Sequence, residues 1–232
     1  MRRAVPIAAL LVGLTFVAGP ASATSGPTNV LSNEVTFSRW VRPLVTGPIR
    51  RKPSKASHVV THLHFMTEDV QPETYLALAE RTVGSVDWVK IRIPMRPNGR
   101  TGWVRRTNLG DFHLVTTRLV VDEKTQRATL YRNGHAIWRS IVGIGAPGTD
   151  TPKGHFYIRE KLTGFGNPFY GPVAFGTSDY SRLTDWPHGG VVGIHGTNEP
   201  ELLPGRVSHG CIRIPNQAVA RLAPIGTPIL IR

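Results

Sequence analysis

Glycine and proline interrupt this sequence so closely that little of it can form long helices. The 232 residues include 24 Gly and 19 Pro, and Val, Ile, Thr and aromatic residues dominate the runs between them. Short runs of this composition, bounded by turn residues, are typical of β-sandwiches and barrels. We therefore predict an all-β protein, with one large or two small domains as this chain length allows.

The N-terminal residues are typical of an export signal. Two arginines precede an apolar run from Ala4 to Ala18, and small residues end at Ala23, as signal peptidase requires. The run is shorter than the roughly 20 residues that a bilayer core requires. We therefore expect a signal peptide over 1–23 rather than a membrane anchor. The mature protein is expected to lie outside the cytoplasmic membrane, secreted or associated with the cell wall.

The chain is strongly basic. Cleavage after Ala23 would remove two of its 28 Lys and Arg residues and leave 15 acidic ones, a net charge of about +11. The basic residues are scattered, the densest cluster being 50–52, and no nucleic-acid motif appears. We expect no nucleic-acid partner. Anionic cell-wall polymers or a membrane surface suit an exported protein better, and a basic surface that serves solubility alone is the alternative.

Residues 37–112 predict a first β domain. A Trp-Val-Lys-Ile strand within 87–93, a turn around 98–100 and a Gly-Trp-Val strand within 101–104 resemble the bacterial Src-homology-3-like barrel. In that family the module usually binds the wall or a neighbouring protein. Its two tryptophans are more often barrel core than ligand platform. Residues 73–81 fit either a strand or a short helix.

Residues 115–232 predict a second β region. Apolar runs at 119–121, 128–131 and 136–142 are typical of a meander, and Asn133-Gly134 suits a type I′ hairpin. Near the C-terminus, Asn216 can cap one short helix that ends before Pro224.

The only cysteine, Cys211, cannot form an internal disulfide. A thiol becomes a useful nucleophile only as the thiolate, which requires a base or a positive local potential. His195 is the natural base. Because it lies 16 positions before Cys211, we expect a loop that returns between two strands to bring them together. An inert buried thiol is the alternative.

Glycines beside both residues suit acyl transfer. Gly210 lets the backbone approach a substrate closely, and amides near Cys211 can stabilise a tetrahedral oxyanion. The Gly196 carbonyl can accept the other ring proton of His195 and so fix its tautomer, as a carboxylate does in serine hydrolases. No acidic residue would then be needed.

These residues belong to two segments, His195-Gly196-Thr197 and Ser208-His209-Gly210-Cys211-Ile212-Arg213. With 143–145, 151–158 and Gly193-Ile194, they resemble the signature of the L,D-transpeptidase catalytic domain: a histidine, a spacer, then Ser/Thr-His-Gly-Cys. The resemblance covers almost all of 115–232. It implies a β-sandwich fold with one short helix.

The resemblance implies an exported enzyme that acts on peptidoglycan stem peptides. Cys211 would attack the carbonyl of the L-centre of the diamino acid in a donor tetrapeptide and release D-Ala as a thioester forms, with His195 as base. An acceptor amine would resolve the thioester and crosslink two third-position residues. Water in its place would make the protein an L,D-carboxypeptidase. Carbapenem-type inhibitors would acylate the same site, and no cofactor or metal is implied.

The resemblance also assigns supporting roles. The Gly196 carbonyl would orient His195, and amides around His209, Gly210 and Cys211 would form the oxyanion hole. The side chain of His209 can instead be structural.

The residues expected to bind substrate are Arg213, Ser208, Thr197 and Tyr170. Arg213 would steady the site or a substrate carboxylate, although one version of the signature has Asn at this position. Tyr170 belongs to an aromatic stretch, 165–180, which can line a substrate groove, pack in the core or form a mobile lid.

Other classes of function fit less well. A zinc site of His195, His209 and Cys211 lacks a fourth ligand, and the pair His62 and His64 lacks a third. A papain-like endopeptidase normally has its cysteine before its histidine, the reverse of the order here. A non-catalytic cationic wall-binding protein would have no need to retain the nucleophile, the base and the glycines together.

Overall fold

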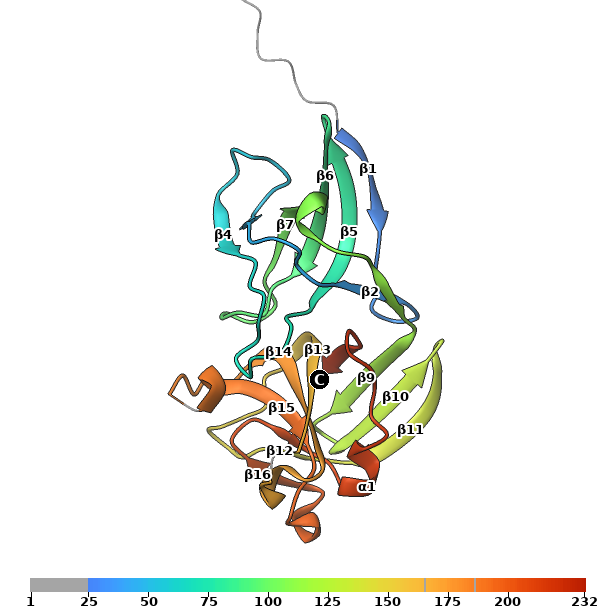
Figure 1. Cartoon of the computed structure of the whole chain (residues 1–232). Coiled ribbons are helices and arrows are strands. Elements are labelled where there is room, and N and C mark those ends of the chain that lie inside the picture. The colour runs from blue at the N-terminus through green and yellow to red at the C-terminus, as the bar shows by residue number, and fades with distance from the viewer. Residues whose placement is uncertain (1–24, 165, 186) are drawn as a thin grey trace, which may run out of the picture.

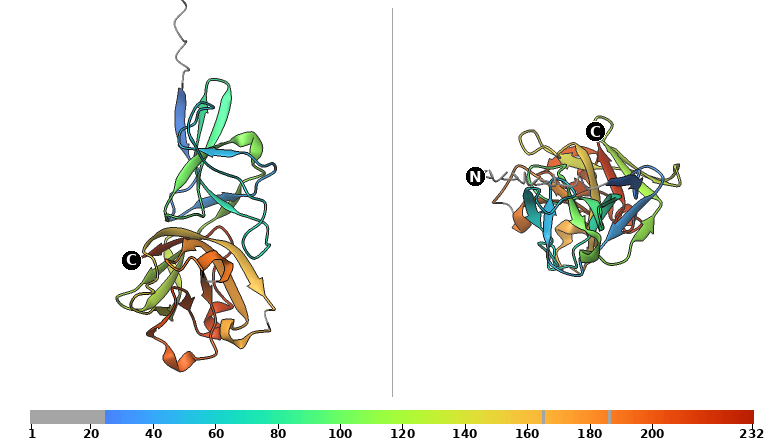
Figure 2. Two further views of the ribbon diagram at one scale, coloured as in Figure 1. Left: turned by 90° about the vertical axis from the view of Figure 1, so that its left-hand side faces the viewer. Right: turned by 90° about the horizontal axis from the view of Figure 1, so that it is seen from above.

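The computed structural model describes residues 25–164, 166–185 and 187–232. The predicted signal peptide, 1–23, lies outside the described residues. The chain forms two β-sheets stacked along the long axis of the molecule, the N-terminal sheet above the C-terminal one (Figures 1 and 2). None of the helices in the described ranges has the length and apolar character needed to cross a bilayer.

The first sheet contains eight of the described strands, in the order β4-β3-β7-β6-β5-β2-β8, with β1 also paired to β5. These are β1 (Ser25–Val30), β2 (Ser38–Val41), β3 (Pro48–Arg50), β4 (Val59–His62), β5 (Tyr75–Val83), β6 (Val86–Arg92), β7 (Thr101–Arg105) and β8 (His113–Val115). The 3-10 turn η1 (Arg106–Asn108) follows β7. Residues 73–81, which fit strand or helix, lie mostly in β5, where Ala77 pairs with Ile91 of β6.

The first sheet has its own hydrophobic core, which includes Val41, Ile49, Tyr75, Val89, Ile91 and Val104. Of the two tryptophans, Trp88 is buried and Trp103 is half-buried. The identity of this unit as a Src-homology-3-like barrel stays a prediction.

The second sheet contains ten of the described strands, in the order β11-β10-β9-β18-β13-β14-β15-β17-β12-β16. They are β9 (Thr117–Asp122), β10 (Arg127–Arg132), β11 (His135–Ile141), β12 (Gly143–Gly145), β13 (Gly154–Thr163), β14 (Val173–Tyr180), β15 (Val191–His195), β16 (Gly205–Ser208), β17 (Ile212–Arg213) and β18 (Pro228–Ile231). The short helices are η2 (Pro168–Tyr170), η3 (Pro187–Gly190), η4 (Pro200–Leu202) and α1 (Asn216–Val219).

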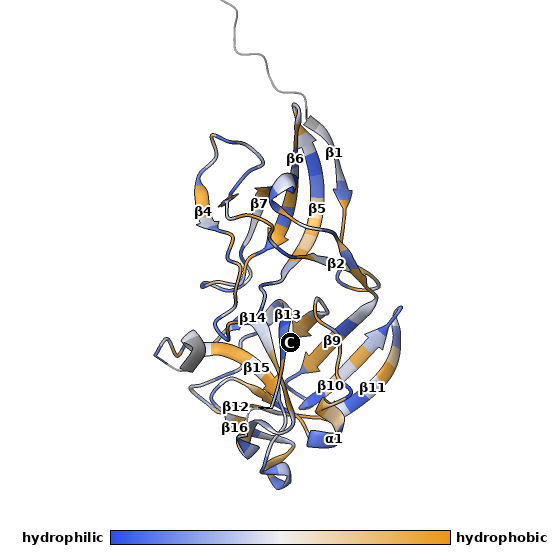
Figure 3. Cartoon of the chain, viewed as in Figure 1, coloured by the Kyte–Doolittle hydropathy of each residue, from blue (hydrophilic) through white to orange (hydrophobic). Residues whose placement is uncertain are grey.

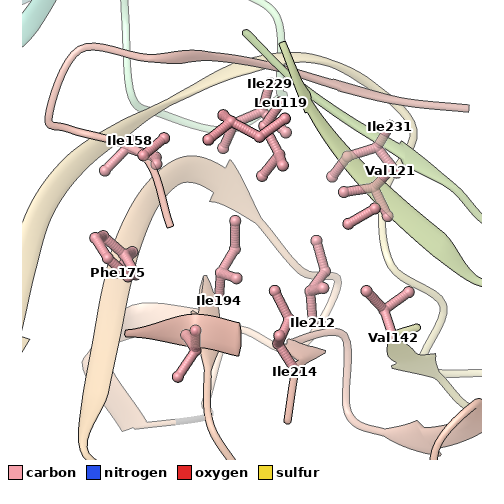
Figure 4. Close-up of a cluster of buried hydrophobic side chains, with 14 of the residues drawn as sticks. Leu119, Val121, Val142, Ile158, Phe175, Ile194, Ile212, Ile214, Ile229 and Ile231 are labelled. Carbon is pink, nitrogen blue, oxygen red and sulfur yellow. The ribbon is translucent and has the colours of Figure 1, made fainter. Parts of the chain in front are cut away.

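The second sheet folds into two layers because β13 belongs to both. The first half of β13 pairs with β18, and its second half pairs with β14. The core lies between the layers: Leu119, Val121, Ile229 and Ile231 face Ile194 and Ile212 across it (Figure 4). The prediction of a nearly all-β fold, with a sandwich and one short α-helix, is confirmed.

Two local predictions have different outcomes. In the turn between β10 and β11, Asn133 and Gly134 both have positive φ, 50° and 81°, as a type I′ hairpin requires. The prediction that Asn216 caps the C-terminal helix is wrong. Pro215 occupies the cap position, and its side chain has no hydrogen-bonding group. The Asn216 side chain accepts instead from the Thr197 N–H in the loop after β15.

Buried polar contacts join the two sheets. Arg159 of β13 is 2% exposed and forms ion pairs with Glu68 and Glu73, both from the connection between β4 and β5. The Thr67 hydroxyl donates to Glu160 at 2.5 Å. Buried charges of this kind are strongly destabilising when one partner is lost, so we expect these contacts to fix how the sheets meet.

Candidate active site

Strand alternation places His195 and Arg213 on one face of the second sheet. β15 and β17 run parallel, with Ile194 paired to Ile212 and His195 to Arg213. Both isoleucines enter the core, and β15 is hydrophobic over most of its length (Figure 3). Since neighbouring side chains on a strand point to opposite faces, His195 and Arg213 lie on the outer face.

Gly193 marks the point where the thiol and the imidazole converge. A Cβ at Gly193 would lie 3.8 Å from Cys211 Sγ and 3.8 Å from His195 Cδ2. The Gly193 N–H donates to Cys211 Sγ at 3.4 Å. The loop from β15 to β17, which includes η4 and β16, therefore brings the predicted nucleophile and base to one place.

His195 is held in one tautomer by its own backbone neighbour. Its Nδ1 lies 2.7 Å from the Gly196 carbonyl oxygen, and because a carbonyl only accepts, Nδ1 carries the ring proton. Nε2 is then the unprotonated nitrogen. Burial lowers the pKa of His195 to about 4, with a smaller contribution from the Arg213 charge, so the ring is neutral and able to accept a proton at pH 7.

The Cys211 thiol is protonated at rest. Burial raises its pKa, and the Asp179 carboxyl adds to this. The Gly193 N–H and the Arg213 guanidinium act in the other direction. These two groups are therefore the ones placed to favour the thiolate once it forms.

The turn that presents Cys211 is held by hydroxyl groups. The Ser208 Oγ donates to the Cys211 carbonyl at 2.6 Å and accepts from the Gly210 N–H at 3.2 Å. The Thr151 Oγ1 donates to the Gly210 carbonyl at 2.8 Å. Gly210 has φ +117°, a conformation that favours glycine. His209, next to it, projects its side chain to the surface.

Two glycines pack backbone against backbone behind His195. A Cβ on Gly196 would lie 2.2 Å from Asn216 Oδ1 and 2.9 Å from Gly171 Cα. A Cβ on Gly171 would meet the same oxygen at 2.3 Å. The Asn216 Oδ1 accepts from the Thr197 N–H at 2.8 Å. Helix α1 is thus tied to the loop that orients the imidazole.

Aromatic rings cover the imidazole from η2. The Tyr170 ring lies edge-on to His195 with centroids 5.1 Å apart, and the Phe169 ring lies 5.7 Å away. The Arg213 guanidinium stacks on Phe169 at 4.6 Å and pairs with Glu199 at 2.8 Å. Burial raises the pKa of Tyr170, and the nearby Cys211 contributes, so the phenol is neutral beside the thiol.

The structure brings some of the predicted substrate-binding residues to the surface of this site and not others. Tyr170 is half-buried. Ser208, Thr197 and Arg213 are at most 5% exposed, and the hydroxyls of Ser208 and Thr197 bond to backbone groups. A substrate contact for these three residues stays a prediction.

The aromatic stretch divides between several environments. Phe169 and Tyr170 border the site, Phe175 lies in the core, and Tyr180 is buried where the sheets meet, donating to Glu68. Position 165 lies outside the described residues. In the described ranges, no group of three His, Cys, Asp or Glu side chains is placed to hold a metal ion.

Sequence reasoning missed several residues that shape this site. Gly193 was recognised only as part of a motif, and Asn216 only as a helix cap. Asp179, on β14 and fully buried, has no local signal, because its partners come from distant segments. An unusual density of glycines at 171, 193, 196 and 210 is the signal that could have indicated close backbone packing.

Comparison with known proteins places this half of the chain in a family. The family model of the L,D-transpeptidase catalytic domain matches residues 116–231. Among curated relatives, YkuD of Bacillus subtilis, named as an L,D-transpeptidase, is 32% identical over 126 residues, which are 53% of this chain and 70% of YkuD. YqjB of the same organism is 30% identical, covering 49% and 69%.

Solved structures include Enterococcus faecium L,D-transpeptidase. The NMR structure of its catalytic domain is 30% identical and covers 50% of this chain and 96% of that domain, with a TM-score of 0.39. A crystal structure of a Cys-to-Ser mutant of the E. faecium protein is 28% identical with the same TM-score, and this chain spans about half of it, 49%. The sequence matches, which cover the whole of the sandwich from β9 to β18, decide the assignment: the chain belongs to the L,D-transpeptidase catalytic domain family.

Proposed function

We propose that this protein is an exported peptidoglycan L,D-transpeptidase that works through a thioester on Cys211. The observation that carries the proposal is the convergence at Gly193 of a partly exposed thiol and a neutral imidazole, with the Nδ1 proton of the imidazole held by the Gly196 carbonyl. This arrangement leaves Nε2 as the base, and it needs no carboxylate. Cysteine nucleophiles activated in this way perform acyl transfer.

In the first half-reaction, Cys211 Sγ attacks the carbonyl of the diamino acid at its L-centre. The thiol proton passes to His195 Nε2 as the S–C bond forms. The bond to the terminal D-Ala nitrogen then breaks, and the imidazolium returns its proton to that leaving amine. The stem peptide remains on Cys211 as a thioester.

In the second half-reaction, the amine of an acceptor stem attacks the thioester. His195 accepts a proton from this amine as the new C–N bond forms, and the S–C bond breaks to regenerate the thiol. A thioester retains enough acyl-transfer reactivity for this step. Water in place of the amine would give L,D-carboxypeptidase activity with the same residues.

Backbone amides at the Cys211 turn are proposed to stabilise the oxyanion. Because the Gly210 N–H already donates to the Ser208 hydroxyl, the Cys211 N–H is a better candidate than the Gly210 N–H. Removal of one such donor commonly costs a few kcal/mol of transition-state stabilisation. Ser208 is then a positioning residue for the turn.

The remaining parts of the chain support work at the cell wall. We place the domain boundary near residue 116, because β8 ends the first sheet at Val115 and β9 begins at Thr117. The first domain and the basic surface would hold the protein to anionic wall polymers. Export rests on the predicted signal peptide.

The decisive experiment uses a disaccharide tetrapeptide donor. Wild type should release D-Ala and form crosslinked dimer, and Cys211→Ala should lose at least about 10³-fold of this activity. Ser140→Ala is the control, because its hydroxyl donates to the Ile141 carbonyl on the outer strand β11. D-Ala release without dimer would identify a carboxypeptidase, and undiminished turnover by Cys211→Ala would refute the thioester.

Inhibitor binding provides an independent test. One related catalytic domain is described as acylated by ertapenem, and one related structure is described as an avibactam carbamoyl enzyme. We expect ertapenem to add one covalent adduct to this protein at Cys211, detected by intact mass and peptide mapping. A thiol that reacts with iodoacetamide but forms no adduct with ertapenem would count against an acyl-transfer site.

A further inference from the structure

The connection between β6 and β7 in the first sheet reaches across to the second sheet. Asn98 Nδ2 donates to the Tyr180 carbonyl at 2.9 Å, and the Tyr180 N–H donates to Asn98 Oδ1 at 3.1 Å. The side-chain amide thus pairs with the end of β14 as a neighbouring strand would. Asn98 Nδ2 also donates to Asp179 Oδ1 at 2.6 Å.

Arg96, two residues earlier, holds the chain that follows β14. Its guanidinium donates to three backbone carbonyls: those of Ser181 at 2.9 Å, Leu183 at 3.3 Å and Gly189 at 2.8 Å. It also stacks on the Tyr180 ring at 4.9 Å. A planar group with several fixed donors suits this task.

The segments that Arg96 and Asn98 bind lie on two sides of the Cys211 turn. One is the chain after β14, and the other is β14 itself, which pairs with β15. A Cβ on Gly210 would lie 3.3 Å from Ser181 Cβ, so Ser181 packs against the residue before the nucleophile. On the other side, β14 pairs with β15 through Gly176 and Gly193 and again through Tyr180 and Val191, with a bulge between. Bulges next to active sites commonly re-aim groups.

The bulge lies next to the donor that reaches the thiol. Within it, the Thr177 hydroxyl donates to the Val192 carbonyl at 2.7 Å, and the Asp179 N–H donates back to Thr177 at 3.1 Å. The next residue of β15, Gly193, donates its N–H to Cys211 Sγ. The first sheet therefore binds β14 beside the bulge, and the bulge sets the position of the Gly193 N–H.

We propose that Arg96 and Asn98 are positioning residues for Cys211, so that the first domain forms part of the catalytic site and is more than a tether. The inference rests on the proposed function in one respect, that Cys211 is the nucleophile. The evidence for the positioning role is the series of contacts that runs from Arg96 and Asn98 through β14 to the Gly193 N–H and to Gly210.

The alternative is that these contacts only join two domains. Elsewhere along the junction, Arg159 joins the two domains through its hydrogen bonds to Glu73. A junction role predicts that loss of Arg96 or Asn98 lowers the melting temperature and leaves the native thiol unchanged. A positioning role predicts a change in the thiol itself.

The readout is the pH dependence of iodoacetamide alkylation of Cys211 in the full chain. The titratable and charged groups near the thiol are His195, Arg213, Asp179 and Tyr170. None of them is substituted in the variants Arg96→Ala and Asn98→Ala. Asn98→Ala also removes the hydrogen bond to Asp179, whereas Arg96→Ala leaves that bond in place and so reports on positioning alone. Since the Gly193 N–H favours the thiolate, loss of its alignment should move the alkylation midpoint upward by about 0.5 to 1 pH unit.

Acylation by ertapenem should fall about tenfold or more in the same variants, because small misplacements of a reacting group are costly. Arg106→Ala is the matched control. Its guanidinium also stacks on a ring, Phe112 at 4.6 Å, and also donates to a carbonyl, Leu109 at 2.7 Å, but within the first sheet. Its thiol midpoint should equal that of wild type.

Asn98→Leu is similar in size, adds no charge beside Asp179 and makes none of the bonds that join Asn98 to β14, so it serves if Asn98→Ala does not fold. Unchanged midpoints and acylation rates in folded Arg96→Ala and Asn98→Leu would overturn the inference. Wild-type protein that is alkylated at Cys211 but neither acylated nor active on the tetrapeptide would refute the proposed function instead. In that case the alkylation midpoints still test the positioning role.

Discussion

Replacing Gly196 by alanine tests whether the close packing behind His195 orients the base. The new Cβ would lie 2.2 Å from Asn216 Oδ1, 2.9 Å from Gly171 Cα and 3.2 Å from Pro172 Cδ. The last two atoms belong to backbone and to a ring, so they cannot swing aside. The carboxamide of Asn216 must move, and it then loses the bond from the Thr197 N–H.

The cost can be worked from these contacts. Loss of the hydrogen bond to Thr197 costs about 0.5–1.5 kcal/mol, and overpacking of a dense site costs about 1–3 kcal/mol. We therefore expect Gly196→Ala to lower the free energy of unfolding by about 2–4 kcal/mol. For a chain of this size, that is a fall in melting temperature of roughly 5–15 °C.

The catalytic effect should exceed the structural one. The clash with Gly171 and Pro172 also shifts the backbone of Gly196. The Gly196 carbonyl accepts the His195 Nδ1 proton, so the imidazole loses its fixed orientation. A displacement of about 1 Å at a reacting group can cost about 100-fold in rate. We expect the rate of ertapenem acylation, measured on protein that is still folded, to fall about 10- to 100-fold.

Two further variants test whether the clash with Asn216 causes the loss of stability. Gly26→Ala is the control, because its Cβ would meet only Thr82 atoms at 3.7–3.8 Å, and its stability and acylation should match wild type. In an Asn216→Ala background the shortest clash is absent, so Gly196→Ala should cost at least about 1 kcal/mol less there. A Gly196→Ala protein within about 0.5 kcal/mol and twofold of wild type would refute the packing argument.

Two more predictions concern pH and access to the thiol. Burial raises the pKa of Glu160 to about 7, so the folded state binds this proton more tightly and stability falls as pH rises from about 4.5 to 7. Between pH 5 and pH 8, Glu160→Gln should lose up to about 2 kcal/mol less of its free energy of unfolding than wild type, a figure discounted for solvent screening. Urea titrations at the two pH values measure this difference. An equal loss in both proteins would contradict the prediction. His195, whose lowered pKa acts in the opposite direction, contributes equally to both proteins and cancels in the comparison. Gly193→Ala should be as stable as wild type, since the new Cβ would meet its nearest atoms at 3.7–3.8 Å. The methyl group beside the Cys211 sulfur should slow ertapenem acylation at least about tenfold. An unchanged rate would show that the acyl group approaches the sulfur from another side.

The sequence predicted most of the fold because the local signals in this chain are strong. Apolar runs at 119–121 and 128–131 indicate strands whether or not their partners are known, and Asn133-Gly134 specifies its turn. The segment 73–81 was ambiguous, because its apolar positions fit both a strand and a helix. Pairing with β6 decides it, and pairing is not visible in one strand.

In the candidate site, too, the residues with local sequence signals were predicted, and those that depend on long-range contacts were not. Cys211, His195 and their glycines were predicted because thiol chemistry requires a base and close backbone approach. Asn216 was misassigned since a helix cap is a local motif, whereas its bond to Thr197 links positions 19 apart. The contacts of Asn98 with β14 span more than 80 residues and leave no pattern in the sequence.

The electrostatics of the site indicate how the thiol is activated. Burial raises the pKa of Cys211 and lowers that of His195 to about 4, so the resting pair is neutral rather than a thiolate and an imidazolium. The thiolate must then form as attack proceeds, with the proton moving to Nε2 while the new S–C bond takes up the charge. Such a thiol should react slowly with simple alkylators at neutral pH and rapidly with acyl donors that place a carbonyl oxygen among the amide donors. The neutral resting pair thus favours reaction with a bound acyl donor over reaction with other electrophiles.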